Sequence, residues 1–184
     1  MVNSFTKGLI AIVMAATGAA CLAATQVVST PEKFMGRWDR NAGIIGLYVR
    51  EVDGIKQARM LVADEYIENA KSKLSIMMTP SDLDDFEDLL ESAWGDLDDA
   101  EKLPVPPINA RVTGDKVGQL AYPHATIKLA TVFPPGTRPY VSMVITTKNP
   151  NHITNLHFVF WMEKEDISNL KKLLDRGLRE MDTQ

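Results

Sequence analysis

The chain has 184 residues, of which 45% are hydrophobic and 24% are charged, and its formal net charge at pH 7 is −4. These values are typical of one globular domain, or of two small half-domains that share a core. The acidic balance argues against nucleic acid as a partner, because proteins that bind nucleic acid need a basic face. It also gives the chain as a whole no attraction to anionic lipid.

The N-terminal residues 1–24 have the pattern of a secretory signal peptide. Lys7 is the only charged residue among them, an apolar run follows at residues 8–16, and small residues continue to Ala24. We expect cleavage after Ala23 or Ala24, which makes the mature protein periplasmic or secreted. An uncleaved membrane anchor is the alternative, since this apolar stretch is at the short end of what spans a bilayer.

Cys21 is the only cysteine of the chain. Ala19 and Ala20 precede it, as small residues precede a lipid-modified cysteine, but Gly18 stands where such sites carry a bulky aliphatic residue. We therefore expect Cys21 to leave with the signal peptide, and a lipid anchor at Cys21 is the alternative. In either case a pair of thiols is missing from the mature chain, so disulfides and cysteine-ligated zinc are excluded. We expect no membrane insertion after cleavage.

Residues 25–43 are expected to be an irregular N-terminal segment, with Trp38 closing one end of the core. The first half then covers residues 44–95. Alternating apolar residues predict its strands at residues 44–52, 58–66 and 73–78. Asp53-Gly54 predicts the hairpin turn between the first two of these strands.

The first half ends in an amphipathic helix predicted from Ser81 to Trp94. Thr79 is placed as the N-cap, Pro80 occupies the first helical position, and Asp82 completes a capping box. An apolar stripe at helical spacing follows, formed by Leu83, Phe86, Leu89, Leu90, Ala93 and Trp94.

Residues 96–110 are interpreted as an acidic and proline-rich linker, because closely spaced prolines exclude both a helix and a central strand. The second half covers residues 111–184. Its strands are predicted at residues 112–118, 126–133, 140–147 and 154–162. The last of these is apolar on both faces, which favours a central strand covered on both sides. A helix from about Glu165 to Met181 ends the chain.

The two strand-to-helix corners resemble each other. Aligning residues 76–90 on residues 160–174 matches Met78 with Met162 and Asp82 with Asp166. The sequence therefore predicts an α+β fold of two antiparallel β-meander-plus-helix halves, with a possible internal duplication. We expect each helix to pack across its own sheet, or both helices to pack across one continuous sheet.

Catalytic and metal-binding patterns are scarce. The histidines are His124, His152 and His157, and the last two are five residues apart, which puts them on opposite faces of a strand. The glycine and histidine motifs of common nucleotide-binding, hydrolase and zinc sites do not occur. We therefore expect no enzyme, no metal site and no cofactor.

The unusual electrostatic feature is an acidic run with no Lys or Arg before Lys102. Its ten carboxylates are Asp82, Asp84, Asp85, Glu87, Asp88, Glu91, Asp96, Asp98, Asp99 and Glu101. Like charges this dense repel one another and cost stability unless something offsets them. A solvated face is the plain interpretation, and a docking surface for a basic protein is the functional one.

The functional hypothesis is an exported, non-enzymatic envelope protein that binds a basic protein partner, as an inhibitor, immunity factor or accessory subunit does. The candidate binding residues are Asp84, Asp85, Asp88 and Glu91, which lie off the apolar stripe of the first helix. The alternative is a carrier or sensor of a small apolar ligand held between sheet and helix, suggested by the nine methionines.

Overall fold

A computed structural model describes residues 30–40, 43–64, 73–147 and 156–183 of the chain. The expectations for the signal peptide, Cys21 and His152 lie outside these ranges. The first half contains β1 (Lys33–Arg40), β2 (Gly43–Val52), β3 (Ile55–Asp64), β4 (Lys73–Met78) and α1 (Pro80–Glu101). The second contains β5 (Thr113–Ala121), β6 (Ala125–Phe133), β7 (Tyr140–Thr147), β8 (His157–Met162) and α2 (Lys164–Asp182).

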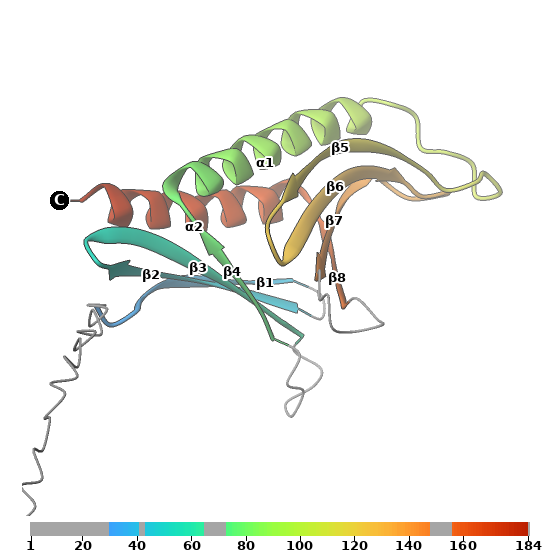
Figure 1. Ribbon diagram of the computed structural model, residues 1–184. Coiled ribbons are helices and arrows are strands. Elements are labelled where there is room, and N and C mark those ends of the chain that lie inside the picture. Colours follow the sequence, from blue (N-terminus) through green and yellow to red (C-terminus); the bar gives the residue numbers. More distant parts are fainter. Residues whose placement is uncertain (1–29, 41–42, 65–72, 148–155, 184) are drawn as a thin grey trace, which may run out of the picture.

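Each half is a four-stranded antiparallel meander followed by one helix (Figure 1). The strand order is β1-β2-β3-β4 in the first sheet and β5-β6-β7-β8 in the second. The predicted class, an α+β fold with two similar halves, is therefore confirmed.

The two corners that lead into the helices are built alike. Thr79 is the N-cap of α1, its Oγ1 accepts from the Asp82 amide at 3.2 Å, and its own amide donates to the Asp82 carboxylate at 2.8 Å. At the second corner the Glu163 amide donates to the Asp166 carboxylate, also at 2.8 Å. These hydrogen bonds satisfy backbone amides at the start of each helix. Both helices therefore begin at the same distance from the strand that precedes them.

The helices are exchanged between the halves. In Figure 1, α2 runs over the first sheet and α1 runs along β5 and β6 of the second. The Trp38 indole of β1 donates to the Asp166 carbonyl of α2 at 3.1 Å, and Leu89 of α1 lies against Gly118 of β5. The expectation that each helix packs across its own sheet is wrong, and so is that of one continuous sheet. Strand periodicity shows that a face is buried, but it does not show which helix buries it.

One hydrophobic core joins the two halves. It includes Met60 of the first sheet, Met143 of the second, Leu90 of α1 and Leu174 of α2, and none of these four side chains is exposed to solvent. Trp38 belongs to the same core and lies with its ring centre 5.4 Å from that of Phe160. Its predicted place at the core is confirmed, and because β1 meets β8 there, the two sheets meet across it.

Three local expectations need correction. The irregular segment predicted at residues 25–43 contains β1, which pairs with β2 alone and has a broken register, so its pattern of burial is not periodic. The helix predicted to end at Trp94 continues to Glu101, because Leu97 and Ala100 are buried and extend its apolar stripe into the predicted linker. The strand predicted to be central, β8, is an edge strand.

Candidate protein-binding surface on α1

Three sides of α1 are covered by the protein itself. Its stripe of Leu83, Phe86, Leu90, Ala93, Leu97 and Ala100 is buried in the core. A second side faces β5, where Leu89 packs and where burial and the nearby Asp82 and Asp85 raise the pKa of Tyr122. A third side faces α2. The remaining side is the solvent-exposed one.

The exposed side carries the carboxylates of Asp84, Asp85 and Asp88, which we call the acidic ridge. These residues belong to the first three turns of the helix. Among the residues that the structure describes, no ion pair reaches any of the three.

Glu91, the fourth candidate residue, differs from the ridge because Lys171 of α2 forms an ion pair with it. Its carboxylate is exposed, but it is already engaged by the protein's own lysine. The structure therefore brings Asp84, Asp85 and Asp88 together and assigns Glu91 to the contact between the two helices.

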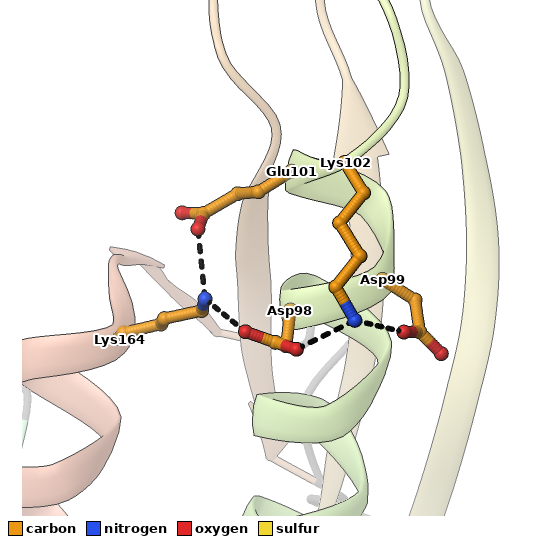
Figure 2. Close-up of polar contacts among 5 residues, drawn as sticks. All are labelled: Asp98, Asp99, Glu101, Lys102 and Lys164. Atoms are coloured by element: carbon orange, nitrogen blue, oxygen red, sulfur yellow. Dashed lines mark hydrogen bonds and ion pairs between the residues drawn. The ribbon is translucent and has the colours of Figure 1, made fainter.

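Lysines pair with Asp98, Asp99 and Glu101 near the C-terminal end of α1 (Figure 2), whereas Asp96 is exposed and has no ion pair among the described residues. Lys164, the first residue of α2, contacts Asp98 at 2.5 Å and Glu101 at 2.8 Å. Lys102 contacts Asp98 and Asp99, each at 2.9 Å. Hydrogen bonds from Lys164 and Lys102 hold the pKa of Asp98 below its ordinary value, and both lysine pKa values are raised in return.

The sequence analysis did not find these pairs. The signal that could have found them is the opposite charge of the two helices, because Lys164 and Lys171 belong to the second helix and the first has an excess of acid. Lys164 also lies 5.2 Å from the centre of the Trp94 ring, a cation–π contact that helps to hold the ends of α1 and α2 together.

A groove of about 410 Å³ runs between α1 and α2 beside the ridge. It is lined by Glu87, Glu91, Trp94, Ser168, Lys171, Lys172 and Asp175. Partial burial raises the pKa of Glu87; Lys171 lowers it, and the carboxylates of Asp175, Asp84 and Asp88 raise it further. Burial is therefore the main cause of the raised pKa, and Asp84 and Asp88 of the ridge add a smaller electrostatic contribution.

Metal-binding geometry is not found in the described part of the chain, where no three His, Cys, Asp or Glu side chains converge. His157 has its Nδ1 3.0 Å from the Thr146 hydroxyl, so its ring is held by the neighbouring strand. Neither described helix is long and apolar enough to cross a membrane.

Comparison with known proteins gives a distant structural likeness. No family model and no curated protein sequence matches the chain. Among solved structures, the chain is similar to MRP1/MRP2 of Trypanosoma brucei, with 9% sequence identity, a TM-score of 0.38 and 84% of each chain covered. A likeness at this level carries no argument about function.

Proposed function

We propose that this chain is an exported, non-enzymatic protein that binds a basic protein partner through the acidic ridge of α1. Such a protein acts stoichiometrically, as an inhibitor, immunity factor or accessory subunit of the periplasm or the secreted fraction does. The observation that carries the proposal is the difference in ion pairing between the two halves of the acidic run. Lysines pair with Glu91, Asp98, Asp99 and Glu101 in its C-terminal half, and Asp96 is the one carboxylate there without an ion pair among the described residues. Asp84, Asp85 and Asp88 are all exposed and have no ion pair in the described part of the chain.

The absence of ion pairs along the ridge has a physical consequence. Exposed carboxylates of one sign repel one another, and Asp84 and Asp88 add to the burial that mainly raises the pKa of Glu87. The repulsion within the ridge therefore lowers the stability of the fold. A basic partner would remove that repulsion on binding. The same field would accelerate encounter, because electrostatic attraction acts mainly on the association rate.

The alternative, a carrier of an apolar ligand, gains no support from the packing. Phe86, Leu90 and Met60 have no exposure to solvent, so side chains fill the space between helix and sheet where such a ligand would be held. Because the side chains are close-packed there, the ridge is the better candidate for a binding site.

The test compares wild type with D84N/D85N/D88N, which removes three negative charges without touching the buried stripe. Its matched control, D115N/E165Q/D182N, removes three exposed carboxylates from other elements and gives the same net charge. A partner is first captured from envelope extract on the wild-type protein and eluted with salt. Association rates of the purified partner are then measured with all three proteins.

We expect the ridge variant to associate more slowly, by about tenfold or more at low salt, since the screening length there is about 30 Å at 0.01 M. The control variant should associate nearly as fast as wild type. Equal slowing of both variants would show that net charge alone is responsible. Unchanged rates for a folded ridge variant would contradict the proposal.

A further inference from the structure

The connection between α1 and β5 exposes an unusual concentration of aliphatic side chains. Within residues 103–112, Leu103 is 57% exposed, Val105 is 51%, Ile108 is 86% and Val112 is 57%. No other segment of similar length in the described ranges exposes four large hydrophobic side chains. Exposed apolar surface that is contiguous in this way marks a contact with another apolar surface.

This connection projects from the body of the protein and is held in shape. Figure 1 shows it extending beyond the end of α1, beside the loop that joins β6 and β7. The Gly136 amide of that loop donates to the Pro106 carbonyl at 2.8 Å, and the Ala110 amide donates to the Pro107 carbonyl at 2.8 Å. Its prolines restrict the backbone further. The loop therefore loses little conformational entropy when its side chains pack against a partner.

The charge at this place is opposite to that of the whole chain. Residues 103–112 and the adjoining residues 134–139 contain Arg111 and Arg138 and no carboxylate, whereas the chain carries a net charge of −4. We call these two segments the apolar tip. Arg138 lines a groove together with Leu103, Val105 and Glu101, so the cation and the aliphatic side chains are neighbours, and the carboxylate of Glu101, which pairs with Lys164, borders them. Neither arginine has an ion pair among the described residues.

We propose that the apolar tip rests on an anionic lipid surface, with its aliphatic side chains in the interfacial layer and its arginines at the headgroups. Side chains of this kind, next to basic residues, enter the interface to a depth of roughly 5–10 Å without spanning the membrane. Aliphatic residues on a projecting tip fit lipid better than protein, because protein hot spots favour Trp, Tyr and Arg in pockets and are poor in Leu and Val.

The net negative charge of the chain does not prevent this contact. The acidic ridge ends at Asp88, and α1 rises about 1.5 Å per residue, so Glu101 lies roughly 20 Å farther along the helix. That separation exceeds the screening length of about 8 Å at physiological ionic strength. Glu101 and Glu165 do lie near Arg138 at the base of the tip, so the contact is expected to be weak and sensitive to salt.

The experiment measures cosedimentation with vesicles, using the chain that begins at Thr25. This chain keeps all described residues and lacks the apolar leader, which would bind vesicles by itself. One vesicle set contains phosphatidylethanolamine and phosphatidylglycerol in equal parts, and the other contains phosphatidylcholine alone. We expect binding at low salt to the anionic vesicles only.

Two variants test the two components of the contact. V105D/I108D should weaken binding by about tenfold or more, because it removes two aliphatic side chains from the interface and places two carboxylates against anionic headgroups. R111Q/R138Q should weaken it about fivefold for each arginine, the effect of about 1 kcal/mol per basic residue near anionic lipid. The controls are I55D, which changes an isoleucine that is 63% exposed at the start of β3, and R37Q/R179Q, which loses the same charge elsewhere.

The proposal requires both controls to bind like wild type. It is overturned if wild type stays in solution with anionic vesicles, if I55D is as weak as V105D/I108D, or if R111Q/R138Q binds like wild type. The arginine variant keeps the test decisive should V105D/I108D fail to fold by circular dichroism. A dimer in the ultracentrifuge that V105D/I108D dissolves, without vesicle binding, would assign the tip to a second copy of the chain instead.

Discussion

Gly177 of α2 lies so close to Leu47 of β2 that a β-carbon at position 177 would stand 2.6 Å from the Leu47 Cδ2 atom. The same β-carbon would lie 3.4 Å from Leu83 of α1. The glycine therefore marks a point where the first sheet and both helices meet. Only a residue without a side chain lets α2 approach the sheet of the other half this closely.

Gly177→Ala and Gly95→Ala should change stability in opposite directions. Both glycines are inside helices, where alanine is favoured by roughly 0.5–1 kcal/mol. A β-carbon at Gly95 meets no atom within 4 Å, so G95A should stabilise the protein by that amount. At Gly177 the added methyl overpacks the core at a cost of about 1–3 kcal/mol, so G177A should be destabilising overall. Urea denaturation measures both, and equal gains would contradict the close approach.

The exchange of helices predicts that the halves unfold together. Leu90 of α1 and Leu174 of α2 are fully buried in the shared core, and replacing either with alanine should cost about 2–5 kcal/mol. Because each helix covers the sheet of the other half, both substitutions should move the same cooperative transition. Denaturation followed by tryptophan fluorescence and by circular dichroism tests this. Two separate midpoints, each moved by one substitution, would show independent halves.

Local signals allowed much of the fold to be predicted. The bounds of β4 and the capping residues Thr79 and Asp82 follow from alternation and from a capping box, which are properties of neighbouring residues. The similarity of the two corners, from Met78 and from Met162 onward, predicted two similar halves. These predictions concern contacts within a few residues, where one sequence carries enough information.

The predictions that the structure contradicts depended on contacts between segments that are distant in the sequence. The pairing of α2 with the first sheet could not be read from periodicity, since any apolar stripe fits any apolar face. β8 looked central because Val159 and Trp161 are apolar, but they are exposed on the outer face of an edge strand, Trp161 by 56%. On the candidate surface, Glu91 was grouped with the ridge because its partner, Lys171, lies 80 residues away in the sequence.

Lys164→Gln should destabilise the protein more than Lys33→Gln. Lys164 contacts two carboxylates, Asp98 and Glu101 (Figure 2). It also lies over the Trp94 ring. We expect the larger loss of stability for K164Q, because an ion pair that belongs to a network contributes more than an isolated exposed pair. Lys33 has one ion pair on a more exposed side chain, so K33Q should cost less than about 0.5 kcal/mol. Equal losses at low salt would show that Lys164 acts as an isolated surface pair.

The stability that Asp98 contributes to the fold should be lost in acid. Hydrogen bonds from Lys164 and Lys102 lower its pKa in the folded state. A carboxyl with a lowered pKa contributes stability that is present above its unfolded pKa of about 3.9 and is lost as the pH falls through its folded pKa. Asp98→Asn should therefore be less stable than wild type at pH 6, and the difference should shrink below about pH 4. Denaturation midpoints of both proteins from pH 7 to pH 3 measure this difference in stability. A difference that does not change with pH would contradict a lowered pKa of Asp98 in the folded state.

Glu87 should have the opposite effect, because its pKa is raised in the folded protein by partial burial and, after the opposing attraction of Lys171, by Asp175, Asp84 and Asp88. A carboxyl with a raised pKa is costly when charged, so the folded state gains stability as the pH falls through that pKa toward the unfolded value of about 4.3. Glu87→Gln should thus be more stable than wild type at pH 7, and the two should converge in acid. In D84N/D88N the pKa of Glu87, followed by NMR of its carboxyl carbon, should fall. An unchanged value would mean that the ridge carboxylates exert no field on the groove, and the electrostatic basis of the proposed partner binding would then be lost.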